Sequence, residues 1–232
     1  MCKRPLITLL LSLSTVAASA ISTLDSLLTV LDNEVAHSAQ YCAAHQQRID
    51  SLEAIRPMTK ALQLRIAREY QYFQSDSART RYMALLQSPE PYRTQAYMGL
   101  VQLSSSIGKY GGGMALLENV QEVPDSLRVD WLEAVWRLYN EAAAATQIPK
   151  LRDNLKATAQ IYYDSLLHTM DEQAVHNTAI RLRREMLAAA DAHRPDIALQ
   201  INDTILSRVE VWSHPYAIEA YSRAMLYEQA GE

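Results

Sequence analysis

The chain has 232 residues, with 22 basic and 26 acidic side chains and a formal net charge of −4. This balance argues against nucleic acid as a partner, because domains that bind DNA or RNA carry basic surfaces. It also argues against an anionic membrane surface. Beyond residue 20 the only cysteine is Cys42, so we expect packing, with no internal disulfide, to hold the fold together.

The first twenty residues have the pattern of an export signal. Lys3 and Arg4 precede an apolar run, Leu6–Val16, and Ala18–Ala20 fits the small-x-small cleavage rule, which predicts a mature chain from Ile21. An uncleaved anchor is the alternative, but the run is shorter than the roughly 20 apolar residues that span a bilayer. Removing the two basic residues from 22 leaves 20 against 26 acidic ones, a net charge of −6.

Helix signals dominate the remaining chain, and the alternation typical of strands is almost absent. Apolar residues at intervals of three and four predict one long helix over Leu24–Ile55, closed by Pro57. Proline and glycine residues then divide the chain into shorter helices. We expect these at 60–74, 75–87, 92–107, 111–121, 127–145, 151–170, 172–192, 195–211 and 215–230.

A period of 34 residues, typical of the tetratricopeptide repeat (TPR), is visible in this helical string. With Gly108 as the turn between paired helices, Tyr97 takes the aromatic position of the first helix. Gly113 then takes the small-residue position of the second. One period later Trp131 occupies the aromatic position, and Ala198-Leu199 resembles the small-large pair of another second helix. The positions expected on the inner faces are Leu100, Val101, Ala134, Val135 and Leu138.

The expected fold is therefore all-α, a TPR-like antiparallel helix-pair solenoid preceded by a long N-terminal helix. We expect a signal peptide at 1–20, an N-terminal helical segment with the long helix at 21–90, and degenerate TPR-like repeats at 91–232. An insertion at 142–150 displaces the second helix of one repeat. Because the last repeat lacks its second helix at Glu232, we expect the chain to be truncated in mid-repeat.

Several stretches resemble an uncharacterised family of exported, membrane-anchored bacterial regulators with N-terminal TPR-like repeats. The stretches that carry this resemblance are Leu24–Leu28, Arg48–Leu52, Val123–Leu127, Tyr162–Leu166 and Ala217–Gly231. In that family, described as transcriptional regulators, periplasmic repeats precede a transmembrane helix, a coiled coil and a cytoplasmic regulatory end. The resemblance implies a periplasmic location and a regulatory role, and it implies no DNA binding by this segment.

TPR arrays bind partners in a groove lined by the first helices, where aromatic anchors and adaptable amides suit peptide recognition. The alternative for Trp136 and Tyr139 is that they pack on a neighbouring helix. The repeat spacing assigns the partner-binding groove to Gln95, Met98, Gln102, Leu132, Trp136, Tyr139 and Asn140.

Catalytic, metal and cofactor sites are not expected. Gly111–Gly113 lacks the Gly-Lys-Ser/Thr ending of a phosphate loop. His37, Cys42 and His45 invite a metal hypothesis, but a fourth ligand is missing and the helical stripe already accounts for Cys42 and His45.

The sequence thus predicts a non-catalytic periplasmic domain for protein interaction or sensing, part of a membrane-anchored regulatory protein. Its partner would be a protein, a peptide or another copy of itself, and it would reach the membrane only through a region beyond Glu232. One alternative is an exported nutrient- or glycan-binding protein of the outer-membrane uptake type, although a lipid-attachment cysteine is missing at the cleavage site. An exported helical hydrolase is the other.

Overall fold

The computed structural model describes residues 28–29, 32, 35–37, 39–40, 42–71, 74–209 and 214–230. The chain divides into two compact units, Met1–Ala54 and Ile55–Glu232. In the first unit the described residues are helical without interruption from 42 to 53, which agrees with the second half of the predicted long helix. The predicted signal peptide lies outside the described residues.

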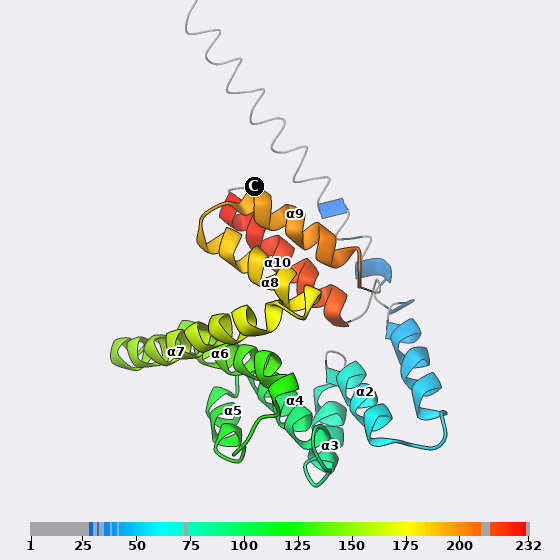
Figure 1. Ribbon diagram of the computed structural model, residues 1–232. Coiled ribbons are helices and arrows are strands. Elements are labelled where there is room, and N and C mark those ends of the chain that lie inside the picture. Colours follow the sequence, from blue (N-terminus) through cyan, green and yellow to red (C-terminus); the bar gives the residue numbers. More distant parts are fainter. Residues whose placement is uncertain are drawn as a thin grey trace, which may run out of the picture. The chain divides into compact units, whose positions relative to one another are not determined.

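The second unit is built from helices throughout its described part, as predicted (Figure 1). The elements are α2 (Lys60–Gln71), α3 (Ser75–Leu85), α4 (Tyr92–Ser106), α5 (Tyr110–Leu117), the 3-10 turn η1 (Asp125–Leu127), α6 (Arg128–Ala145), α7 (Pro149–Ala174), α8 (Thr178–Asp191), α9 (Pro195–Leu206) and α10 (His214–Ala230). None of the described helices is long and apolar enough to cross a membrane.

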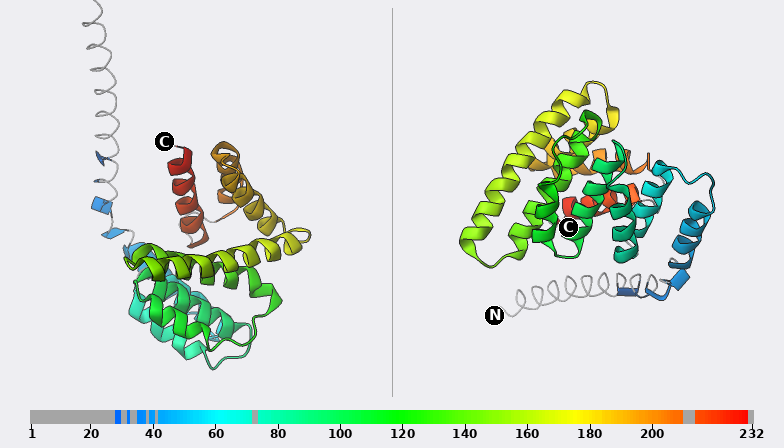
Figure 2. Two further views of the ribbon diagram at one scale, coloured as in Figure 1. Left: turned by 90° about the vertical axis from the view of Figure 1, so that its left-hand side faces the viewer. Right: turned by 90° about the horizontal axis from the view of Figure 1, so that it is seen from below.

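These helices pack as successive antiparallel pairs, α2 with α3, α4 with α5, α6 with α7, and α8 with α9. We call α2, α4, α6, α8 and α10 the first helices. In the early part of the array each first helix also contacts the next, α2 with α4 and α4 with α6, whereas α8 packs on α7 and α10 on α9. Figure 2 shows α9 and α10 on one side of α7 and α2 to α5 on the other. This is the arrangement of a TPR-like solenoid.

The turns inside two pairs have the same hydrogen-bond pattern. Gly108, at φ 71°, follows α4; its N–H donates to Ser105 O and that of Lys109 to Ser104 O. His193, at φ 54°, follows α8 with the equivalent bonds from His193 and Arg194. Both are Schellman motifs, which end a helix with one residue in the left-handed conformation. The predicted turn at Gly108 is confirmed.

The small-residue positions follow these turns at equal spacing, five residues later. Gly113 is buried in α5, and a Cβ built on it would lie 2.9 Å from Cδ1 of Leu138 and 3.2 Å from Cβ of Ser104. Ala198 in α9 is fully buried among residues of α8 to α10. The predicted close approach at Gly113 is confirmed, and Ala198 takes the equivalent place.

Adjacent glycines of α5 should respond oppositely to alanine. Gly113→Ala is expected to lower the free energy of unfolding by about 1 kcal/mol, because crowding against Leu138 exceeds the gain in helix propensity. Gly112→Ala should raise it by about 0.5–1 kcal/mol, because an added Cβ meets nothing within 4 Å. Urea denaturation followed by circular dichroism measures both. Equal effects would contradict the close packing of Gly113.

The core confirms the predicted inner faces. The inner-face positions of α4 and α6 are all buried, at 0–5% exposure: Leu100, Val101, Ala134, Val135 and Leu138. Tyr97 and Trp131, one period apart, meet in one cluster that also receives Val120 from the segment after α5. A second cluster joins α6, α7 and α8, and a third joins α8, α9 and α10.

Some predicted helix ends were wrong. α7 continues to Ala174, so Asp171 and Glu172 lie within it and do not open the next helix. α8 starts only after Asn177, whose side-chain oxygen accepts the N–H groups of Ala179 and Ile180. An asparagine that caps two orphan amides is a stronger start signal than acids in a first turn. α5 ends at 117 and α9 at 206, earlier than predicted.

Candidate functional site

The predicted aromatic anchors lie on α6 and face α7. The ring of Trp136 is 5.1 Å from that of Tyr163, and the ring of Tyr139 stacks on Tyr162 at 5.6 Å. Trp136 and Leu132 also pack against the cluster that joins α6, α7 and α8. These rings are therefore half-buried between paired helices, and a partner would reach only their remaining surface.

The other predicted groove residues differ in exposure. Met98 is buried, 6% exposed, in the cluster with Trp131 and Val135. Gln95 and Gln102 are half-buried on α4, and Asn140 is exposed on α6. Gln102 accepts a hydrogen bond from the Gln71 amide at 3.4 Å, which links first helices α2 and α4. Of the seven positions only Asn140 is exposed, Met98 is buried and the other five are half-buried. The binding role of the set stays a prediction.

A charged cluster that the sequence did not predict joins the later first helices. Glu133 of α6 accepts hydrogen bonds from Arg137 Nη2 at 2.7 Å and from Arg183 Nη2 of α8 at 2.6 Å. Arg183 Nε is 3.7 Å from Oε1 of Glu219 on α10. The Glu133 and Glu219 side chains are 17% and 8% exposed. The cluster therefore holds α6, α8 and α10 together through largely buried charges.

Asn202 of α9 contacts this cluster through Glu219. Its side chain is fully buried, and Nδ2 donates to the Glu219 carbonyl at 3.2 Å and contacts the Glu219 carboxylate at 3.4 Å. Its Oδ1 has no hydrogen-bond partner within the described chain. A buried amide that meets only part of its hydrogen-bonding capacity is costly, so Asn202 helps to fix Glu219 at a price in stability.

The acids of the cluster have pKa values shifted in opposite directions. Burial alone would raise the pKa of Glu133, but the guanidinium groups of Arg183 and Arg137 outweigh it and hold the pKa below its ordinary value. Burial raises the pKa of Glu219, and Arg183 offsets this only in part. Desolvation likewise raises the pKa of Asp130, three residues before Glu133, although its side chain reaches solvent. The arginines near Glu133 thus more than offset its burial, whereas those near Glu219 and Asp130 do not.

Removing the charge of Glu219 should reveal its raised pKa. The folded state binds this proton more tightly than the unfolded state, so acidification from neutral pH toward the ordinary value of 4.5 stabilises the fold through Glu219. Glu219→Gln mimics the protonated form and is expected to raise Tm by at most a few degrees at pH 7, with the difference disappearing near pH 4.5. Thermal unfolding at both pH values measures this.

Glu228→Gln, on the exposed part of the same helix, is the matched control and should leave Tm unchanged. A lower Tm for Glu219→Gln at pH 7 would show that the Arg183 contact outweighs the burial of Glu219.

Some contacts of this charged cluster could be predicted from residue spacing within one helix, and others could not. Asp130, Glu133 and Arg137 follow each other at spacings of three and four, so the sequence could have placed them on one face of α6. The decisive partner, Arg183, is 50 residues from Glu133. No pattern within one helix points to such a contact.

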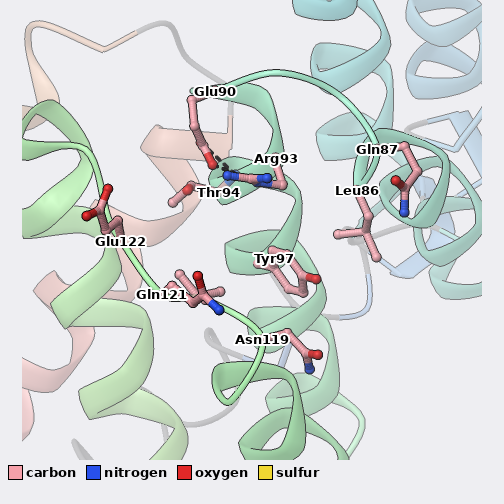
Figure 3. Close-up of a pocket in the computed structure, with 10 residues that line it drawn as sticks. Leu86, Gln87, Glu90, Arg93, Thr94, Tyr97, Asn119, Gln121 and Glu122 are labelled. Carbon is pink, nitrogen blue, oxygen red and sulfur yellow. Dashed lines mark hydrogen bonds and ion pairs between the residues drawn. The ribbon is translucent and has the colours of Figure 1, made fainter.

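A separate polar pocket of about 550 Å³ lies between the end of α3, the start of α4 and the segment after α5 (Figure 3). Glu90 caps the first turn of α4 with two hydrogen bonds. Its Oε1 accepts one from Arg93 Nε at 2.8 Å, and its Oε2 accepts one from the Thr94 N–H at 3.2 Å. Burial would raise the pKa of Glu90, but these hydrogen bonds from Thr94 and Arg93 lower it overall. The pocket is lined by Leu86, Gln87, Glu90, Arg93, Thr94, Tyr97, Asn119, Val120, Gln121 and Glu122.

Within the described residues, no group of three or more His, Cys, Asp and Glu side chains is arranged to hold a metal ion. Cys42 is exposed and is not in a disulfide. The described residues thus offer helix surfaces and a polar pocket.

The helix pairs, their Schellman turns and the small-residue positions define a TPR array. The model of the family described as the SusR N-terminal TPR domain matches residues 35–232, and the chain belongs to this family. The predicted resemblance to regulators with N-terminal TPR repeats agrees with this match. Comparison with curated proteins and with solved structures gave no match.

Proposed function

We propose that this chain is the exported, periplasmic sensory and protein-interaction domain of a membrane-anchored regulatory protein, and that it acts by binding without catalysis. The observation that carries the proposal is the family match across residues 35–232 to a regulator's N-terminal TPR domain. TPR arrays are quasi-one-dimensional stacks whose extended surfaces suit the binding of protein segments. The partner would contact the first helices, and the regulatory output would belong to a region beyond Glu232.

The proposed location rests on the pattern of the first twenty residues. Lys3 and Arg4, the apolar run and Ala18–Ala20 support export and cleavage before Ile21. Cell fractionation of the tagged chain, followed by N-terminal sequencing, tests this. Recovery in the periplasmic fraction with Ile21 as the first residue is expected, and retention in the cytoplasm with Met1 intact would refute export.

Site-specific photo-crosslinking tests the binding surface. A photoreactive amino acid at Asn140, exposed on first helix α6, is expected to capture a protein partner, and excess wild-type domain should abolish the product. The same group at Lys156, exposed on second helix α7, is the matched control and should capture nothing specific. Equal products at both positions, or none at Asn140, Gln95 and Gln102, would refute binding by the first helices.

A further inference from the structure

The polar pocket carries charged and amide groups that the fold leaves available. Figure 3 shows Glu90 and Arg93 at one end, Tyr97 in the middle, and Gln121 and Glu122 along the segment after α5. Its volume of about 550 Å³ falls within the range of small-molecule sites, roughly 300–1,000 Å³. Unlike most such sites it is lined mainly by polar side chains, so a polar ligand suits it best.

Arg93 is oriented for binding by its own neighbours. Its Nε donates to Glu90, and Glu90 is in turn held by the backbone N–H of Thr94. Neither Nη atom has a hydrogen bond or ion pair among the described residues, and the Arg93 side chain is 54% exposed. A guanidinium anchored through Nε presents its two Nη groups as a fixed pair of donors, which matches a carboxylate.

Glu122 supplies the opposite charge from a different segment. The structure gives its carboxylate no hydrogen bond or ion pair with any described residue. Gln87 and Gln121 likewise keep their side-chain amides available, while Asn119 uses only its Nδ2, on the Ala115 carbonyl. The pocket therefore combines a positioned guanidinium, a carboxylate and amide groups that can both donate and accept hydrogen bonds.

We propose that this pocket binds a small zwitterion that carries an α-ammonium and a carboxylate group, namely a free amino acid or a short peptide. Arg93 receives the ligand carboxylate, and Glu122 receives the ammonium group. The remaining polar groups of the ligand bond to the amides of Gln87 and Gln121 and to the side-chain oxygen of Asn119. A side chain of the ligand would contact the small apolar surface of Leu86 and Val120. Because both charges are partly exposed, we expect a Kd between about 10 µM and 1 mM.

Calorimetry on the full chain with four probes tests this proposal. The probes are L-leucine, the dipeptide Leu-Leu, N-acetyl-leucine and leucinamide. At least one of the two zwitterions is expected to bind at least tenfold more tightly than both blocked compounds, and the stronger of the two identifies the free amino acid or the peptide as the source. Equal affinity for blocked and unblocked probes, or no binding of any probe at 10 mM (about tenfold above the weakest expected Kd), would overturn the proposal.

Variants then assign the ammonium to Glu122. Glu122→Gln should weaken the zwitterion at least fivefold and leave N-acetyl-leucine unaffected, because that compound has no ammonium group. Glu118→Gln, on an exposed acid that does not line the pocket, is the control and should bind as the wild type. Unchanged zwitterion affinity in Glu122→Gln would overturn the assignment. These measurements use the isolated chain, so they are independent of the partner crosslinking.

Discussion

Replacing Glu133 by alanine is expected to lower the free energy of unfolding by about 3–5 kcal/mol, the cost of leaving buried charges without their partner. Both oxygens of Glu133 are used, by Arg137 and by Arg183. Its loss leaves Arg183, 27% exposed, with only the 3.7 Å contact to Glu219. Urea denaturation followed by circular dichroism measures the change.

The exposed ion pair of Arg181 and Glu185 on α8, 2.8 Å long, provides the control. Glu185→Ala should cost no more than about 0.5 kcal/mol, because solvent screens this pair. The triple variant Glu133→Leu, Arg183→Met and Glu219→Gln removes all three charges, leaves no buried acid without its partner, and should recover a large part of the loss. If Glu133→Ala cost as little as Glu185→Ala, the charged cluster would not stabilise the packing of α8 on the rest of the array.

Gly99→Ala is expected to lower the free energy of unfolding by about 2–3 kcal/mol. A Cβ on Gly99 would overlap the ring of Tyr82, which is 1% exposed and donates a hydrogen bond of 2.6 Å to Gln71 Oε1. The ring belongs to α3 and Gly99 to α4, so the clash would separate one helix pair from the next. Thermal and urea denaturation both report this change.

Two further variants test whether the clash with the Tyr82 ring causes the destabilisation by Gly99→Ala. Gly111→Ala adds the same methyl group where nothing lies within 4 Å, and it should be neutral or stabilising. In a Tyr82→Leu background, which makes room, Gly99→Ala should cost less than about 1 kcal/mol. An undiminished cost there would place the cause of the destabilisation elsewhere than in the ring contact.

The sequence predicted what depends on neighbouring residues. The turn at Gly108, the small residue at Gly113 and the period from Tyr97 to Trp131 all repeat at fixed spacing, because each repeat solves the same packing problem. Such spacing survives even where the repeats are degenerate. The helix predicted at 172–192 begins later, at Thr178, because the Asn177 side chain caps its first amides.

Contacts between distant helices could not be predicted from residue spacing. Gly99 must be small because of Tyr82, 17 positions earlier in another helix, and Glu133 is paired by Arg183 from two helices further on. The polar pocket arises where the end of α3 meets the segment after α5. For Trp136 and Tyr139, the aromatic pattern suits partner binding and packing on α7 equally, and only the ring distances reveal the contact with α7.

The attachment of α8 has a mechanical consequence. The helices α8 to α10 share their own cluster and meet the earlier array where α8 packs on α7 and Arg183 reaches Glu133. A rotation at this joint would move α8, α9 and α10 together, because they share one cluster. At 1.5 Å per residue, the 17 residues of α10 extend roughly 25 Å, so a rotation of about 10° at the joint would carry the far end of that helix by roughly 4 Å. A small change where α8 meets α7 and Glu133 would thus produce a larger displacement at the far end of α10.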